Sequence, residues 1–200
     1  MLATPRIKLT PVAPTLGNPD QVRSEETTII LRKNAWDWGD TDGYTIVVAS
    51  ATPGSARDKM EVLNEVGTHL YDIKNRISVH RTMQGKRDQH EFFEVQNEKT
   101  QKVTTDHESV MTGWWKDTSG TRRFAIKGNW YKGEAVVWLS ESNHPIGTIL
   151  TADSQEGYQR VGGETKGEED YQVRVAPGVD LQVFAGICIA AETILAKAAK

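Results

Sequence analysis

The chain has a single cysteine, Cys188, among its 200 residues. An intramolecular disulfide is therefore excluded, and so is a zinc site built from several cysteines. Long apolar runs are also missing, because no stretch approaches the roughly 20 residues needed to span a bilayer. The first 26 residues lack the apolar centre of a secretory signal. These absences predict a protein of the cytoplasm, located in solution or peripherally at a membrane.

The sequence also lacks an excess of positive charge. It has 24 Lys and Arg against 27 Asp and Glu, which gives a net charge of −3. Proteins that bind nucleic acids usually carry a basic excess, so we expect no nucleic-acid partner. Hydrophobic residues make up 38% and charged residues 26% of the chain, which is typical of a folded globular domain.

Proline is concentrated at the start of the chain. Four of the seven prolines fall within residues 1–26. Proline removes a backbone donor and restricts φ, so this stretch is not expected to form a helix or a central strand. We predict a disordered or loosely docked tail over 1–26, with a docked extended arm as the alternative. The folded domain is expected over 27–200.

From Thr27 onward, short stretches rich in β-branched and aromatic residues alternate with polar turns. The predicted strands cover 27–32, 44–49, 68–72, 77–82, 91–96, 110–116, 144–151 and 171–175. Turns are predicted at 39–43 and 84–89, and a loop at 52–60.

The clearest predicted hairpin spans Arg122–Ser142. Phe124, Ile126 and Trp130 share one parity on its first strand. The returning strand, 135–139, is apolar on both faces, which is typical of a fully buried strand. This pattern places Trp130 and Trp138 in the core.

The end of the chain predicts a helix over about 181–198. Asp180 is a good N-cap, because its carboxylate can accept hydrogen bonds from free backbone N–H groups of the first turn. The helix is apolar almost all round, with Glu192 as the one charge within 181–196. Such a helix is buried on every side or lies in a membrane. Its core positions are Phe184, Ile187, Cys188 and Ile189.

Many short strands followed by one hydrophobic helix predict a mainly β fold. A closed antiparallel β-barrel with the helix through its centre accounts for both signals, because closure removes exposed strand edges and the helix fills the interior. Within this helix Cys188 is expected to behave as a small hydrophobic residue.

Three segments carry a resemblance to a known family. They are Phe124-Ala125-Ile126-Lys127-Gly128-Asn129-Trp130, the apolar return strand Ala135-Val136-Val137-Trp138, and the segment from Tyr171 to Asp180 that leads into the helix. Their order and spacing resemble the LURP-one-related proteins, which belong to the Tubby C-terminal-like superfamily together with the phospholipid scramblases. The resemblance implies a barrel of about twelve strands around a central C-terminal helix.

The same resemblance implies a non-enzymatic binding protein. Tubby proteins bind phosphoinositides through basic residues on the barrel face, so we expect phosphoinositides or anionic membrane surfaces as partners. The candidate lipid-binding residues in this sequence are Arg122, Arg123, Lys127 and Lys132. No catalytic residue set, cofactor or metal is implied, and a monomer is expected.

Two other functions stay open. The tryptophan pairs Trp36-Trp38 and Trp114-Trp115 lie near predicted turns, where exposed rings could bind a carbohydrate or another small ligand. An enzyme whose site is dispersed over loops is the second alternative.

Metal binding has little support in the sequence. Asp37, Asp40 and Asp42 lie close together, as in a calcium loop, but the later glutamate of an EF-hand is missing. The five histidines have no spacing that suits metal ligands, although His80 and His90 could face each other across two strands.

Overall fold

The computed structural model describes ten segments of the chain: 7–31, 37–40, 45–50, 59–64, 67–76, 81–97, 109–117, 120–130, 134–151 and 171–198. They contain twelve strands and one α-helix. The strands are β1 (Thr27–Leu31), β2 (Asp37–Asp40), β3 (Thr45–Ser50), β4 (Lys59–Asn64), β5 (His69–Arg76), β6 (Thr82–Arg87), β7 (His90–Asn97), β8 (Ser109–Asp117), β9 (Gly120–Gly128), β10 (Ala135–Leu139), β11 (His144–Thr151) and β12 (Tyr171–Val175), and the helix is α1 (Leu181–Ala198). The predicted mainly β, antiparallel fold with a C-terminal helix is confirmed.

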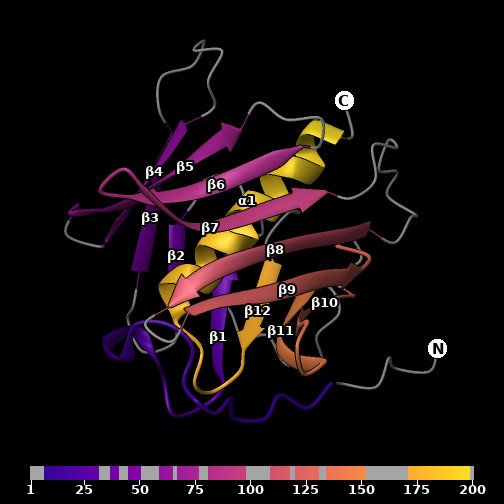
Figure 1. The fold of residues 1–200 in the computed structure, drawn as a ribbon. Coiled ribbons are helices and arrows are strands. Elements are labelled where there is room, and N and C mark those ends of the chain that lie inside the picture. Colours follow the sequence, from indigo (N-terminus) through magenta and orange to yellow (C-terminus); the bar gives the residue numbers. More distant parts are fainter. Residues whose placement is uncertain are drawn as a thin grey trace, which may run out of the picture.

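The sheet follows the order of the chain. From β2 to β12, each strand pairs antiparallel with the next one. Strand β1 pairs with β12 on one side and with β2 on the other. The sheet curves around α1, which runs between β6–β9 and β1, β2 and β12 (Figure 1).

Three segments differ from the sequence-based expectations. Strand β2 extends into the turn expected at 39–43, because it ends at Asp40, and β4 begins at the end of the loop expected over 52–60. The predicted turn at 84–89 is mostly strand β6, and the turn itself is Asp88-Gln89, with φ values of 50° and 67°. Polar composition was misleading at β6, because this strand directs a buried polar side chain, Gln84, to the outer face of the sheet.

Strand β10 also corrects one prediction. Its residues alternate between buried and half-buried, with Ala135, Val137 and Leu139 inside. Trp138 belongs to the outer face and is half-buried, so it is not the core residue that the apolar strand predicted. The strand is apolar on both faces although only one face contacts the helix. Trp130, in the turn after β9, is 1% exposed.

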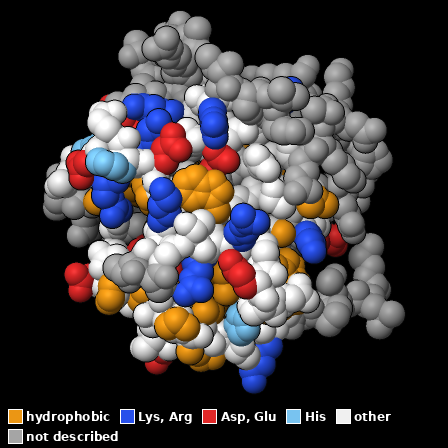
Figure 2. Space-filling view, in the orientation of Figure 1, with side chains coloured by type: hydrophobic (Ala, Val, Ile, Leu, Met, Phe, Trp, Pro, Cys, Tyr) orange, Lys and Arg blue, Asp and Glu red, His pale blue; other side chains and the backbone are white. Residues whose placement is uncertain are grey.

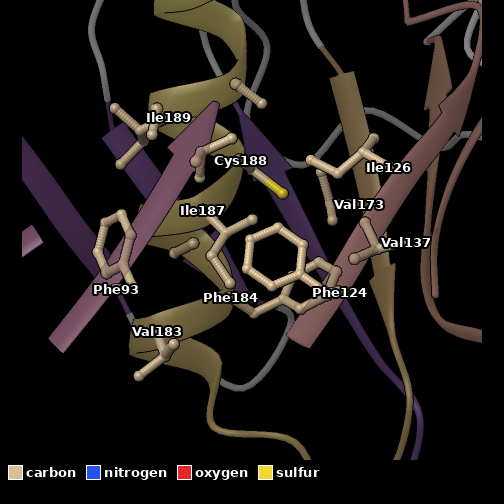
Figure 3. Close-up of a cluster of buried hydrophobic side chains, with 14 of the residues drawn as sticks. Phe93, Phe124, Ile126, Val137, Val173, Val183, Phe184, Ile187, Cys188 and Ile189 are labelled. Atoms are coloured by element: carbon tan, nitrogen blue, oxygen red, sulfur yellow. The ribbon is translucent and has the colours of Figure 1, made fainter. Parts of the chain in front are cut away.

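The helix fills the space inside the sheet. Phe184, Ile187, Cys188 and Ile189 are each at most 1% exposed, and their side chains point towards different strands (Figure 3). Phe184 packs directly against the backbone of Gly147 in β11, where any added Cβ would collide with the ring. The helix therefore lies close to β11 because that strand carries no side chain at this point. In the described part of the chain, no helix combines the length and apolar character needed to cross a bilayer.

The N-terminal segment differs most from expectation over the residues described, 7–26. Leu9 is 5% exposed and Leu16 is 2% exposed, so both are part of the core. The Val12 N–H donates to the Pro177 carbonyl at 2.9 Å, and the Leu16 N–H donates to the Gly178 carbonyl at 2.7 Å. The segment runs beneath β1 and β12 as a docked arm, and a disordered tail is wrong for these residues (Figure 1). Its prolines exclude regular strands but leave backbone groups free to bond to the loop before α1.

Candidate functional site

The predicted basic residues of β9 lie on two opposite faces. Phe124 and Ile126 point inwards and are at most 1% exposed, and Arg122 has the same parity. The Arg122 Nε donates to Asp117 Oδ2 at 3.4 Å, and this carboxylate side chain is 1% exposed. Arg123 and Lys127 are exposed on the outer face. Arg122 is therefore separated from the other two, because successive residues of a strand point to opposite faces.

Lys132, the fourth predicted residue, lies outside the described residues.

Tryptophans flank the exposed basic residues on both neighbouring strands. Trp114 of β8 lies directly opposite Arg123. Trp138 of β10 lies directly opposite Ala125, which stands between Arg123 and Lys127 on the outer face of β9. Both tryptophans are half-buried. The outer face thus brings two indole rings beside two positive side chains.

A third positive charge belongs to the same face. Lys116 follows Trp114 by two residues on β8, and its Nζ lies 5.4 Å from the centre of the Trp114 ring. At this distance the ammonium group is attracted to the electron-rich face of the ring. Trp114, Lys116, Arg123, Lys127 and Trp138 together form what we call the basic-aromatic surface.

Carboxylates are few around this surface. Among the described residues, no carboxylate forms an ion pair with the side chain of Lys116, Arg123 or Lys127. Glu141 accepts a hydrogen bond from the backbone N–H of Arg123 at 2.9 Å, and Glu134 is exposed before β10.

Most basic residues of β5 to β7 differ, because carboxylates pair with them; the exception is Arg87 of β6, whose guanidinium lies 5.1 Å from the centre of the Phe92 ring. Glu94, 8% exposed, accepts from Arg76 at 2.9 Å and from the Gln84 amide at 2.8 Å. Asp72 lies 3.2 Å from Lys74, and Glu91 lies 3.2 Å from Lys86. Figure 2 shows Lys and Arg spread over this side of the molecule, with acidic side chains between some of them. Within the described residues of β5 to β9, the exposed positive side chains without a paired carboxylate are therefore Lys116 of β8, Arg123 and Lys127 of β9, and Arg87 of β6.

The interior offers no comparable site in the described part of the chain. Near the start of α1, a small space lies between Leu16, Trp115, Phe184 and Ile187, and it is too narrow for a water molecule. Trp115 is 2% exposed and belongs to the core, so Trp114 and Trp115 are not a pair of loop rings. Trp36 lies outside the described residues, and nothing is described of the Trp38 side chain.

The described histidines have ordinary polar partners. His69 lies 2.9 Å from Asp72, His90 bonds to the Asp88 carbonyl, and His144 contacts Thr10. In the residues that the structure describes, no group of His, Cys, Asp and Glu could hold a metal ion. His80, His107, Asp42 and the side chains of Asp37 and Asp40 fall outside the description.

Asp180 connects the start of α1 to the N-terminal arm through hydrogen bonds of its carboxylate. Its Oδ1 accepts from the backbone N–H of Gln182 at 2.9 Å and of Val183 at 3.1 Å, which confirms the predicted N-cap. Its Oδ2 accepts from the N–H of Asn18 in the arm at 2.8 Å. Burial raises the pKa of Asp180, and the backbone hydrogen bonds and the charge of Arg87 oppose this shift only in part. The carboxylate links two chain segments and is enclosed, so its role is structural.

Sequence reasoning found Arg123 and Lys127 but missed Trp114, Lys116 and Trp138 as their neighbours. The alternation along β8 could have identified two of them, because Trp114 and Lys116 lie on either side of the buried Trp115 and therefore share the outer face. The pairing of β10 with β9 could not be read as a register from the sequence, and this register sets Trp138 beside the basic residues.

An antiparallel sheet wrapped around a buried C-terminal helix, with a charged outer face, defines a mainly β, helix-centred class of protein. A comparison with family models matches the LURP-one-related family over residues 25–192. The chain belongs to the LURP-one-related family, in agreement with the resemblance seen in its C-terminal motifs, and this family is consistent with the Tubby-like superfamily. No curated protein and no solved structure matches the chain in the corresponding searches.

Proposed function

We propose that the chain is a non-enzymatic binding module that attaches to anionic membrane surfaces, with phosphoinositides among its ligands. The observation that carries the proposal is the exposure of Arg123 and Lys127 on one face of β9, with Lys116 on the neighbouring strand. Positive side chains without paired carboxylates keep their charge available for phosphate groups. The protein would act as a monomer at the cytoplasmic face of a membrane.

We further propose that the sheet is a closed, Tubby-like barrel. Support comes from the pairing of Ile29, Ile30 and Leu31 in β1 with Asp40, Gly39 and Trp38 in β2. Closure would hold the outer face of β8 to β10 rigid, because no free edge near it could open.

Vesicle sedimentation tests the membrane proposal. Binding to phosphatidylcholine vesicles that contain phosphatidylserine or a phosphoinositide should exceed binding to phosphatidylcholine alone, and it should fall as salt rises, since charges are screened over about 10 Å at 0.1 M. The double variant Arg123→Gln/Lys127→Gln should bind about 30-fold more weakly, at about 1 kcal/mol for each lost charge.

A matched control removes two charges elsewhere. Lys8 lies on the arm and Lys86 is paired with Glu91, so Lys8→Gln/Lys86→Gln should bind almost like the wild type. Equal losses in the two double variants would refute the site, because binding would then depend on total charge. Wild-type protein that ignores anionic vesicles would refute the function.

A further inference from the structure

The basic-aromatic surface has an arrangement that charge alone does not require. On β9, Arg123, Ala125 and Lys127 point outwards in succession. The strand register places Trp114 beside the first of them and Trp138 beside the second, on opposite sides of the strand. Two large rings therefore flank β9 on opposite sides, one level with Arg123 and the other level with Ala125.

The rings of Trp114 and Trp138 are only half-buried, whereas other aromatic residues of β8 and β9 lie in the core. Trp115, the next residue after Trp114, is 2% exposed, whereas Trp114 stays on the outside. Half-buried apolar residues adjoin Trp138, with Pro145 and Val136 on its side of the sheet. These half-buried apolar side chains lie beside exposed positive ones, a combination that suits an anionic and partly apolar partner.

The backbone of this region cannot recruit a peptide strand. Strand β9 is hydrogen-bonded to β8 on one side and to β10 on the other. Addition of a strand needs an unpaired edge, which β9 does not have. Recognition here must use side chains, and the side chains present are indole rings and positive groups.

We propose that the basic-aromatic surface docks flat on an anionic bilayer, with the rings of Trp114 and Trp138 inserted at the level of the lipid headgroups. Indole rings favour the membrane–water interface because they join an apolar body to a polar N–H group. Lys116, Arg123 and Lys127 face the lipid phosphates between and beside the rings. This inference rests on the proposed membrane function and assigns its orientation and its apolar anchors.

The acidic groups around the surface agree with this orientation. Glu94 lies opposite Trp114 on β7, but Arg76 and Gln84 bind its carboxylate. Glu141 lies at the Arg123 end of the surface, where its carboxylate accepts a hydrogen bond from the Arg123 backbone N–H at 2.9 Å, and Glu134 directly precedes β10. Among the described residues, no carboxylate forms an ion pair with Lys116, Arg123 or Lys127, so these three side chains keep their positive charge available.

The first test compares the salt dependence of variants. Trp114→Ala, Trp138→Ala and the double variant are measured by sedimentation with phosphatidylcholine vesicles containing phosphatidylserine. Each tryptophan is expected to bury about half of its apolar area in the membrane. Replacing either ring with alanine should therefore weaken binding on the order of tenfold. This loss should persist at high salt, whereas the loss caused by Arg123→Gln/Lys127→Gln should shrink as salt screens the charges. Equal thermal unfolding midpoints would show that the variants are folded.

A second test uses the conservative replacement of tryptophan by phenylalanine. Lipids with brominated acyl chains should quench part of the wild-type tryptophan fluorescence on binding. Trp114→Phe/Trp138→Phe should reduce this quenching, since Trp115 and Trp130 are buried and cannot reach the lipid.

The outcomes separate the two proposals. Salt-sensitive vesicle binding with no effect of the tryptophan variants and no quenching would overturn the inference and leave the proposed function standing. Wild-type protein that does not bind anionic vesicles would overturn both. Single-stranded RNA that binds through Trp114 and Trp138 when vesicles do not would assign the surface to nucleic acid and likewise overturn the inference.

Discussion

Asp180 shows how one residue can join two distant parts of a fold. Its carboxylate caps α1 and binds the arm through Asn18, and its own N–H donates to the Leu16 carbonyl at 2.8 Å. Gly17 lies directly against its Cβ atom, where any larger residue would collide. Because the side chain is 4% exposed, every bond lost there leaves a donor without water.

Asp180→Asn should lower the free energy of unfolding near neutral pH by about 1–3 kcal/mol. The amide oxygen can still cap the helix, but the amide NH2 would face the Asn18 N–H instead of accepting from it. Urea unfolding of the variant and the wild type measures the difference.

The pH dependence has a definite sign. The raised pKa of Asp180 means that the folded protein holds this proton more tightly than the unfolded chain does. Its contribution to stability is complete below the ordinary pKa of 3.8 and is lost as pH rises through the raised value. The stability advantage of wild type over Asp180→Asn should therefore shrink as pH rises through this window. The exposed Asp20→Asn serves as control, and a wild-type advantage that grows with pH would contradict the prediction.

At the scale of elements, the N-terminal arm is an integral part of the fold, although it has almost no regular secondary structure. Leu16 forms a parallel bridge with Val179, and Val22 forms an antiparallel bridge with Asp180. Arg174 of β12, 5% exposed, donates to both carboxylate oxygens of Glu26, with each bond 2.6 Å long. The arm covers the outer face of β12 and the loop before α1.

Leu16→Ala should destabilise the domain by about 2–5 kcal/mol, because the side chain is buried against Trp115 and Phe184. The neighbouring Thr15 is exposed, so Thr15→Ala should change stability by no more than about 0.5 kcal/mol. Thermal or urea unfolding of both variants decides the matter. A Leu16→Ala variant as stable as wild type would mean that the arm is only loosely attached.

At the scale of the whole molecule, the main feature is that the sheet surrounds the first half of α1. The residues of α1 from Leu181 to Ile189 are at most 8% exposed. Cys188 lies in the middle of this buried stretch, and burial raises the pKa of its thiol well above the ordinary value. A thiol in this state forms little of the thiolate that reacts with electrophiles.

Cys188 should therefore react slowly with a thiol reagent in the native protein and rapidly in denaturant. Its labelling rate across a denaturant series should follow global unfolding, since the thiol lies among Ile126, Val173 and the helix (Figure 3). Rapid labelling without denaturant would indicate that the helix leaves the sheet easily. The chain contains no other cysteine, so the signal needs no correction.

Local pattern alone was enough for much of the fold. The β-branched stretches and the apolar run after Asp180 indicated strands and a buried helix, because these signals depend on near neighbours in the chain. The N-cap at Asp180 and the boundaries of β10, β11 and β12 were predicted for the same reason. The family motifs around Lys127 and Pro177 then pointed to the correct family.

Only the tertiary structure decided which strand faces meet and what covers them. Arg122 and Arg123 are neighbours in sequence, yet their side chains point to opposite faces of β9. Arg122 forms an ion pair with Asp117, whereas Arg123 is exposed on the outer face. Trp138 looked like a core residue in an apolar strand, but only the register with β9 shows that it faces outwards. The proline-rich arm read as a tail, because its partners lie about 160 residues further along the chain. Contacts over such distances depend on the tertiary arrangement of the chain, which no local window of sequence contains.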